Sequence, residues 1–300
     1  MSEFLELAQR GRTQWWRYPL AIVLAVVLWL IACTAAIVAL GLAHVMPADI
    51  SAELTQPTHI AVFYGATGAM FGALLASFAI AIAVVHGKSF ASIVGVWRWR
   101  RLAIGAAVWV VVCILGGAVD FGLQPGGFHA SASAATWRLA LWAIPSLTIQ
   151  TFTEEFIFRG YVTQALLLAT RRPLATAVLS GLCFALLHIP NGWPQAASAL
   201  AFGVITALIA IRTAGIAFTF GLHLANNLFG ALIVVSANDV FRGSPALITQ
   251  ATPRLMWFDA ALPFIALLAL LWLVAKPAGR LSPRRSPIPP SWRKPGPRVF

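Results

Sequence analysis

Residues 19–43 read PLAIVLAVVLWLIACTAAIVALGLA and contain no charged side chain. A bilayer core is about 30 Å thick, so roughly 20 consecutive apolar residues form one helical crossing. This stretch is longer than the apolar core of a signal peptide and has no small-residue cleavage site after it. We therefore expect a first transmembrane span that is retained.

The rest of the chain repeats this pattern. Of the 300 residues, 60% are apolar and only 10% are charged, a balance that soluble domains of this length do not have. Strand-type alternation is absent, so helices carry the spans. The sequence predicts an all-α integral membrane protein of about eight transmembrane helices. The apolar runs lie at 19–43, 58–86, 102–122, 137–168, 173–189, 194–211, 214–236 and 257–275.

The run at 137–168 is too long for one plain crossing. It is either tilted, or protrudes from the membrane, or begins with an interfacial helix. Trp137, Arg138 and Trp142 precede Pro145 in its first part, and such residues are typical of the membrane interface.

Basic residues mark one side of the membrane. Of the 21 Lys and Arg, 17 lie in the N-terminal segment, the loops at 87–101 and 171–172, the turn at Arg212 and the C-terminal tail. Arg242 and Arg254 lie on the other side. By the positive-inside bias both termini are cytoplasmic, as an even number of spans requires. Because these residues form no basic face on a soluble domain, the net charge of +12 does not indicate a nucleic-acid partner.

Apolar and basic segments divide the chain into five parts. The three cysteines fall inside apolar runs without metal-ligand spacing, so they are interpreted as small core residues. The last part has too little apolar material to form a core. The parts are a cytoplasmic N-terminal segment at 1–18, transmembrane helices at 19–136, a core at 137–236, a loop with the last span at 237–276 and a basic, Pro-rich cytoplasmic tail at 277–300.

Two adjacent carboxylates interrupt the fourth apolar run. Glu154 and Glu155 are the only acidic residues deep in such a run, where a charge costs at least about 2.5 to 3.5 kcal/mol on insertion scales. At about 100° per residue, Glu155 and Arg159 share a helix face, whereas Glu154 is turned away from that pair. We expect Arg159 to neutralise Glu155, which leaves Glu154 free to act as a general base. A structural ion pair and a proton relay are the alternatives.

Further polar side chains lie in later spans. His188 ends the fifth run, and His223 and Asn227 share one helix face in the seventh. At about 1.5 Å per residue, Glu154 and His188 lie roughly 25 Å from the basic ends of their helices, and Asn227 about 22 Å. These side chains are therefore expected in one layer of the bundle.

Together these residues resemble the CAAX-protease and bacteriocin-processing family of intramembrane endopeptidases, also called CPBP or Abi/Rce1-like. Three motifs of that family occur in the expected order. They are EExxxR at 154–159, FxxxH from Phe184 to His188, and HxxxN from His223 to Asn227. The resemblance covers roughly 137–236.

The resemblance implies a hydrolase that cuts a peptide bond of a membrane-associated protein, with its active site inside the helical bundle. It implies that Glu154 and His188 activate a water, while His223 and Asn227 stabilise the oxyanion. This division suits the chemistry, because a carboxylate and an imidazole can deprotonate water and two donors on one face can form an oxyanion hole. The supporting residues are Glu155, Arg159 and Phe184.

No cofactor is favoured by these motifs. The sequence has no HExxH, and the FxxxH motif supplies a single histidine. A water activated by glutamate without metal is therefore preferred. The alternative is a zinc-bound water held by Glu154, His188 and His223.

Two other classes of protein also use buried Glu, Arg and His: a proton-coupled transporter and a non-catalytic membrane scaffold. Neither requires this order of motifs. The expected partners are a membrane-associated peptide or protein substrate and the lipid bilayer. The Ala-, Arg- and Trp-rich composition without eukaryotic targeting signals indicates a bacterial inner membrane.

Overall fold

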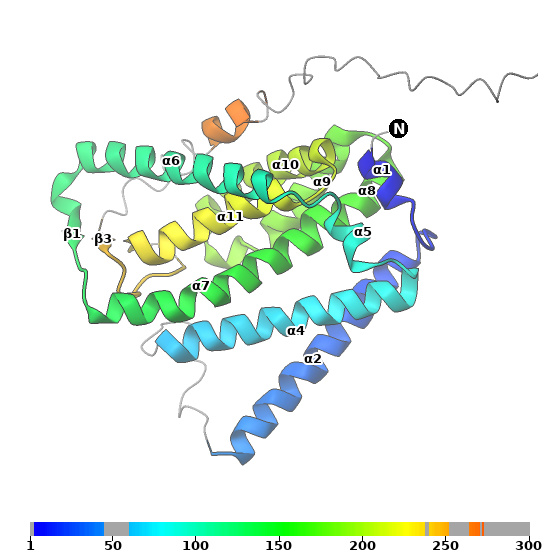
Figure 1. Cartoon of the computed structure of the whole chain (residues 1–300), viewed down its shortest axis with the longest axis horizontal. Helices are drawn as coiled ribbons and strands as arrows, with labels where there is room; N and C mark the ends of the chain where they lie inside the picture. The colour runs from blue at the N-terminus through cyan, green and yellow to red at the C-terminus, as the bar shows by residue number, and fades with distance from the viewer. Residues whose placement is uncertain (1–2, 45–59, 238–239, 252–263, 271, 273–300) are drawn as a thin grey trace, which may run out of the picture.

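The computed structural model of the chain describes residues 3–44, 60–237, 240–251, 264–270 and 272. Almost all of the named elements are helical (Figure 1). The first half contains α1 (Glu3–Ala8), α2 (Arg17–Leu42), α4 (Ile60–His86), α5 (Phe90–Val94) and α6 (Trp99–Leu123). The second half contains α7 (Ala134–Glu155), η2 (Phe156–Val162), α8 (Thr163–Thr170), α9 (Pro173–Leu186), α10 (Trp193–Thr213), α11 (Ala217–Leu228) and η4 (Phe229–Ile233).

The helix α7 lies in the middle of the bundle. It packs against α4 on one side and against α11 on the other, and α11 in turn packs against α6 (Figure 1). The outermost α2 contacts α4, and α9 pairs with α10. The carboxylates at the end of α7 are therefore enclosed by helices from both halves of the chain.

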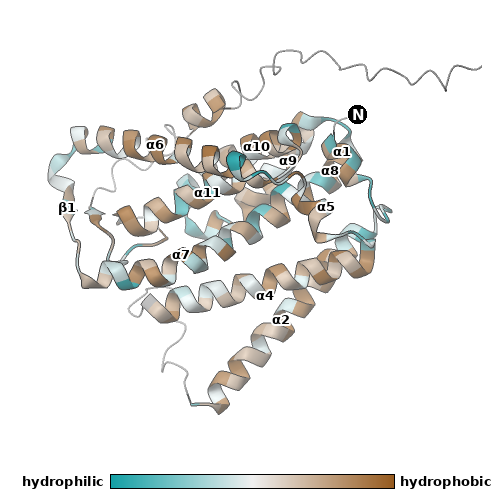
Figure 2. Ribbon diagram, in the orientation of Figure 1, coloured by the Kyte–Doolittle hydropathy of each residue, from teal (hydrophilic) through white to brown (hydrophobic). Residues whose placement is uncertain are grey.

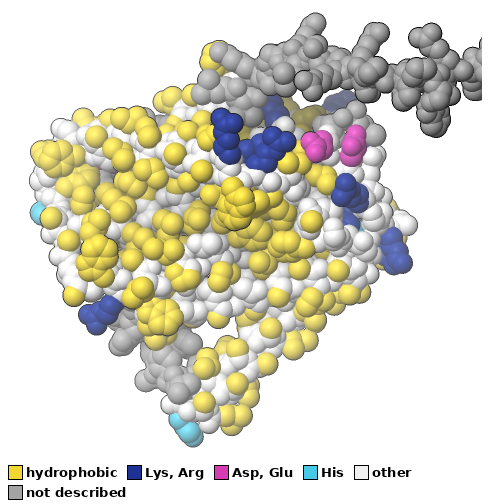
Figure 3. Space-filling model, viewed as in Figure 1, with side chains coloured by type: hydrophobic (Ala, Val, Ile, Leu, Met, Phe, Trp, Pro, Cys, Tyr) yellow, Lys and Arg dark blue, Asp and Glu magenta, His cyan; other side chains and the backbone are white. Residues whose placement is uncertain are grey.

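Four described helices are long and apolar enough to cross a membrane. They are Arg17–Leu42, Ala61–His86, Trp99–Leu123 and Trp193–Thr213. Hydrophobic residues dominate along α2, α4 and α6, and apolar side chains cover much of the visible surface (Figures 2 and 3). An all-α type of membrane protein is confirmed in this coarse sense.

The count of about eight spans remains a prediction. The helix Pro173–Leu186 and the segment Ala217–Ile233 are apolar but shorter than the four long helices. The long run predicted at 137–168 forms one continuous helical segment made of α7, η2 and α8. Most of the run predicted at 257–275 lies outside the described residues.

Glycines allow two pairs of helices to approach closely. A Cβ atom on Gly105 of α6 would lie 2.2 Å from the Phe218 carbonyl oxygen, and one on Gly221 of α11 would lie 2.1 Å from the Leu102 carbonyl oxygen. Small residues are the usual means by which membrane helices pack, since lipid offers no hydrophobic drive for their association. The same device joins α9 and α10, where Gly181 and Gly203 face each other.

A small sheet lies at one end of the bundle, and the sequence did not predict it. Three strands form it in the order β1 (Phe128–Ala130), β3 (Ile248–Gln250) and β2 (Val234–Ser236). The β1 and β3 strands are antiparallel, and β2 and β3 are parallel. The apolar run predicted as helix at 214–236 therefore ends as a strand in its last three residues. Strands this short are too brief to show an alternating pattern.

The loops that carry basic residues meet at one end of the bundle. The short α1 contacts α5, α8 and α10, and Gly95 forms an isolated bridge with Gly215. Lys and Arg side chains gather over the end that carries the N-terminus (Figure 3). This grouping is what a positive-inside topology requires, while the side of the membrane on which this end lies stays a prediction.

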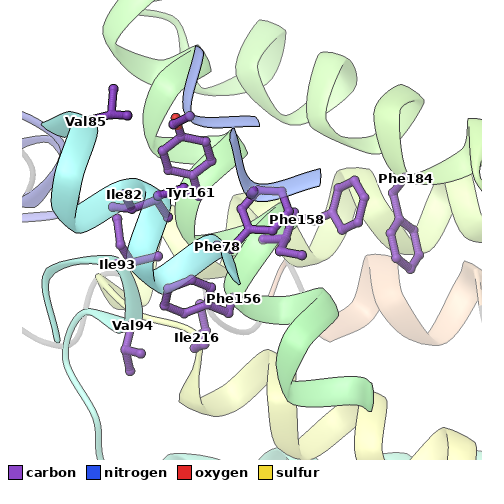
Figure 4. Packing of buried hydrophobic residues seen from close by; sticks show 14 of the residues in the cluster. Phe78, Ile82, Val85, Ile93, Val94, Phe156, Phe158, Tyr161, Phe184 and Ile216 are labelled. Atoms are coloured by element: carbon purple, nitrogen blue, oxygen red, sulfur yellow. The ribbon is translucent and has the colours of Figure 1, made fainter. Parts of the chain in front are cut away.

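An aromatic and aliphatic cluster fills the core beside the carboxylates. Phe156, Phe158 and Tyr161 of η2 pack with residues of α4 and α5, including Phe78, Ile82 and Ile93, and Figure 4 shows these side chains around η2. Their burial fixes the rotation of the segment that follows Glu155.

Candidate active site

The two glutamates lie where the central helix changes its geometry. The helix α7 begins at a capping box formed by Ser133 and Thr136 and ends at Glu155. The next seven residues, Phe156–Val162, form a π-helix. Thr163, the first residue after the π-helix, donates its hydroxyl to the Phe158 carbonyl oxygen at 2.7 Å. Short π-helical turns within α-helices often occur at functional sites, because they re-aim the neighbouring side chains.

Glu155 lies in the centre of a buried charge cluster. Its side chain is fully buried, and its Oε1 atom lies 3.5 Å from Nε of Arg159 and 2.9 Å from Nδ1 of His223. The predicted pair of Glu155 with Arg159 is therefore present. The contact with His223 was not predicted. Through it, Glu155 also holds the imidazole ring.

Arg159 is buried against aromatic rings. Its Nε donates to the Thr206 hydroxyl at 2.9 Å, and its guanidinium carbon lies 4.1 Å from the ring centre of Phe184 and 5.2 Å from that of Phe202. The two terminal nitrogens have no hydrogen-bond partner within the described part of the chain. Cation–π contacts and the nearby carboxylate thus stabilise this buried charge. Thr206 and Phe202 of α10 lie outside the three motifs, so neither could be predicted from the motif pattern.

His223 stands between the two carboxylates. Its Nδ1 faces Glu155, and its Nε2 lies 3.7 Å from Oε2 of Glu154. Because an ionised carboxylate only accepts hydrogen bonds, Nδ1 is assigned as a protonated nitrogen of the ring. Glu155 therefore orients the imidazole, and Nε2 is the nitrogen that faces Glu154.

Glu154 is the more accessible of the two glutamates. Its side chain is 14% exposed, whereas that of Glu155 is fully buried. Its Oε1 accepts a hydrogen bond from Nε2 of Gln150. Its Oε2 has no hydrogen-bond partner among the described residues. This oxygen is therefore an acceptor that the described residues leave unused, 3.7 Å from Nε2 of His223.

Asn227 reaches the same region through Gln150. Its Nδ2 donates to Oε1 of Gln150 at 3.0 Å and to the hydroxyl of Thr151 at 3.1 Å. Asn226 donates to Oδ1 of Asn227 at 3.2 Å and accepts a hydrogen bond from the Trp109 indole at 2.9 Å. Sequence reasoning missed Gln150, although a polar residue one turn before Glu154 in an apolar run is a usable signal.

His188 lies beside this cluster. It lies in the turn that follows α9, is half-buried, and its Nδ1 lies 2.8 Å from the Phe184 carbonyl oxygen. Its ring centre is 4.4 Å from that of Phe184, which is itself 6.1 Å from that of His223. Within the residues that the structure describes, no hydrogen bond or ion pair is assigned between His188 and Glu154. The structure thus brings together Glu154, Glu155, His223 and Asn227. His188 lies outside this group, on the Phe184 ring that also neighbours His223.

The described residues contain no group of three or more His, Cys, Asp or Glu arranged to hold a metal ion. The alternative zinc site at Glu154, His188 and His223 would need His188 to move towards the two others. The preference for a metal-free water stays a prediction.

The cluster as a whole combines a carboxylate that can accept a proton with nearby hydrogen-bond donors. Residues 136–229, which contain all of it, match the sequence model of the family described as type II CAAX prenyl endopeptidase Rce1-like. The family resemblance inferred from the motifs is confirmed by this match.

One curated protein is similar over a wider stretch. The chain is 31% identical over 169 residues to the uncharacterized protein YyaK of Bacillus subtilis (strain 168). The alignment covers 53% of this chain and 56% of that protein, so the chain matches little more than half of the relative's length. No solved structure matches the chain at a significant level.

Proposed function

We propose that the chain is an intramembrane endopeptidase, because residues 136–229 match the sequence model of the Rce1-like family. In this proposal it hydrolyses a peptide bond of a membrane-associated protein or peptide. The observation that carries the proposal is the geometry of Glu154, whose free Oε2 faces Nε2 of His223 at 3.7 Å inside an apolar bundle. A transporter or a scaffold does not need this arrangement beside three ordered motifs.

The proposed reaction begins with a water held at Oε2 of Glu154. Glu154 removes one proton while the water oxygen forms a bond to the substrate carbonyl carbon. With a proton on each ring nitrogen, His223 donates from Nε2 to the oxyanion that develops, and Asn227 donates from Nδ2. The C–N bond then breaks, and the proton on Glu154 passes to the leaving amine nitrogen.

Two supporting roles complete this proposal. Glu155 holds the His223 ring through Nδ1, so that Nε2 points towards the reacting atoms. His188 is retained as the second group that binds the water. Its side chain contacts Phe184 in this structure, so substitution of His188 by Ala decides whether it takes part: we expect turnover to fall by about 10² to 10⁴-fold.

The substrate class is proposed from the family description. A CAAX prenyl endopeptidase acts on a peptide that carries a lipidated cysteine near its carboxyl terminus, and such a peptide partitions into a bilayer. We propose lipid-anchored or membrane-embedded polypeptides as substrates. An internally quenched peptide with an S-farnesyl cysteine is the probe for purified protein.

The test in cells compares membrane fractions from strains that carry the wild type or Glu154→Gln. Mass spectrometry should find at least one cleavage product that is present with the wild type and absent with the variant. Identical peptide profiles, together with purified protein that moves a solute and cleaves no probe, would favour the transporter instead.

A further inference from the structure

The side chain of Gln150 joins two residues that the proposed reaction uses. It lies one helical turn before Glu154 on α7 and is half-buried. Its Nε2 donates to Oε1 of Glu154, and its Oε1 accepts from Nδ2 of Asn227 at 3.0 Å. Glu154 and Asn227 come from different helices, so this amide is a direct bridge between α7 and α11.

The chemistry of the bridge fixes its polarity. An ionised carboxylate has only acceptor sites, so Gln150 must turn its NH₂ group towards Glu154. The carbonyl oxygen of Gln150 then faces Asn227, and Asn227 must present its own NH₂ group in return. Asn226 agrees with this orientation, because its Nδ2 donates to Oδ1 of Asn227 at 3.2 Å.

We propose that Gln150 is a positioning residue that holds the base Glu154 and sets the donor orientation of Asn227. Through this relay, the charged state of Glu154 determines that Asn227 turns its NH₂ group, and not its carbonyl oxygen, towards Gln150 and Thr151. This inference rests on the proposed function, since it assigns Gln150 to the same reaction.

The relay leaves both catalytic groups able to act. With Oε1 of Glu154 held by Gln150, Oε2 remains for the water. Asn227 shares its NH₂ group between Gln150 and the Thr151 hydroxyl, at 3.0 and 3.1 Å. If an oxyanion replaces the Thr151 hydroxyl as an acceptor, Nδ2 of Asn227 can donate one hydrogen bond to it. The other hydrogen bond of Nδ2, to Oε1 of Gln150, still holds the side chain of Asn227 in place.

The experiment uses the full chain in lipid nanodiscs and the S-farnesyl peptide. Gln150→Met keeps the length of the side chain and removes its hydrogen bonds with Glu154 and Asn227, together with the one that its Oε1 accepts from the Thr151 hydroxyl at 3.3 Å. We expect kcat to fall by roughly 10 to 100-fold with KM within about twofold, because the base and the donor lose their alignment while substrate contacts remain.

A matched control lies on the same continuous helical segment. Gln164 is fully buried, and its Nε2 donates to the Ser92 carbonyl oxygen at 2.8 Å, so this hydrogen bond involves neither glutamate. Gln164→Met should lower thermal stability and leave kcat close to that of the wild type. A purely structural role for Gln150 would make the two variants behave alike.

A double-mutant cycle tests whether Gln150 acts through Asn227. If it does, the loss of kcat in the double variant Gln150→Met/Asn227→Ala should be smaller than the product of the two single losses, although the lost contact with Glu154 still contributes. Independent action would multiply the two losses, and that result would overturn the proposal. An unchanged kcat in Gln150→Met would overturn it as well.

A second measurement does not depend on turnover. A membrane-permeant carbodiimide modifies carboxyl groups, and mass spectrometry locates the modified residue. Glu154 should be modified at least about threefold faster in Gln150→Met than in the wild type or Gln164→Met, because its Oε1 has lost the amide. If the wild type cleaves no peptide, the proposed substrate class fails by that result, whereas equal modification rates in all three proteins would overturn the role of Gln150.

Discussion

Glu155 contacts both Arg159 and His223. We expect its substitution to affect stability through Arg159 and turnover through His223. Glu155→Gln leaves Arg159 as a buried cation without a carboxylate partner, so we expect a loss of about 3 to 5 kcal/mol in unfolding free energy. The same variant releases the His223 ring, so the remaining folded protein should also turn over more slowly. Thermal unfolding and kcat of the purified variant measure the two effects separately.

The second substitution Arg159→Leu separates stability from activity. In the Glu155→Gln background it removes the stranded charge, so much of the stability should return. Turnover should stay low, since nothing at position 159 restores the orientation of His223. Full recovery of turnover in the double variant would contradict the assigned role of Glu155.

The residues of the site differ in how well the sequence predicted them. A buried charge is costly enough to be conspicuous, so Glu154, Glu155 and Arg159 stood out at once. A neutral amide costs much less in an apolar run, and for this reason Gln150 escaped notice. The helix spacing placed His223 and Asn227 on one face but gave no indication that His223 contacts both glutamates, because contacts between helices depend on packing.

At the scale of one element, the π-helix after Glu155 depends on close contact with α5. A Cβ atom on Gly160 would lie 2.7 Å from Cγ2 of Ile93 and 2.9 Å from its carbonyl oxygen. Gly160→Ala should therefore push the segment away from α5, destabilise the protein by about 1 to 3 kcal/mol and reduce turnover. Thermal unfolding and peptide cleavage by the purified variant test both expectations.

The control for this prediction is Gly117→Ala on α6. A Cβ atom there meets no atom within 4 Å among the described residues, and alanine favours a helix by about 1 kcal/mol over glycine. This variant should be as stable as the wild type or slightly more so. Equal stability and equal turnover of the two variants would contradict the claim that the fold and the site depend on the close approach of Gly160 to α5.

Helices were more predictable than the details within them. The run predicted at 19–43 corresponds to α2 at Arg17–Leu42, since apolar length alone defines such a span. The π-helix was not predicted, because a shift in backbone hydrogen bonding leaves no trace in hydropathy. The three-residue strands were missed for lack of any period to recognise.

At the scale of the whole molecule, a buried lysine at the basic end predicts how the stability of the fold depends on pH. Lys88 lies between α4 and α5, is 3% exposed, and donates to the Ala8 carbonyl oxygen at 2.8 Å. Burial lowers the pKa of its ammonium to about 8 from an ordinary 10.5. The folded chain therefore binds fewer protons than the unfolded chain between about pH 8 and 10.5, so this group adds stability as pH rises through that window.

The variant Lys88→Met removes this contribution. Thermal unfolding of the wild type at pH 7 and pH 9.5, compared with that of the variant, should show a smaller gain at high pH in the variant. An identical pH dependence in both proteins would contradict the lowered pKa of Lys88 in the folded chain.

The distribution of basic residues predicts the orientation of the molecule in the membrane. Both termini and the loops next to Arg100 at the start of α6, Arg171 and Arg212 at the end of α10 should face the cytoplasm. Single cysteines placed in these loops should resist a membrane-impermeant reagent in intact cells and react after the cells are opened. Efficient labelling of residues 277–300 from outside would reverse the assigned orientation.

The central claim is that Glu154 is the base of a hydrolytic site, and one measurement tests it most directly. Purified wild type and Glu154→Gln are compared for turnover of the S-farnesyl peptide and for thermal unfolding. The substitution keeps the size of the side chain and removes the base, so kcat should fall by about 10² to 10⁴-fold while the unfolding temperature stays near that of the wild type. A well-folded Glu154→Gln that cleaves as fast as the wild type would contradict the claim.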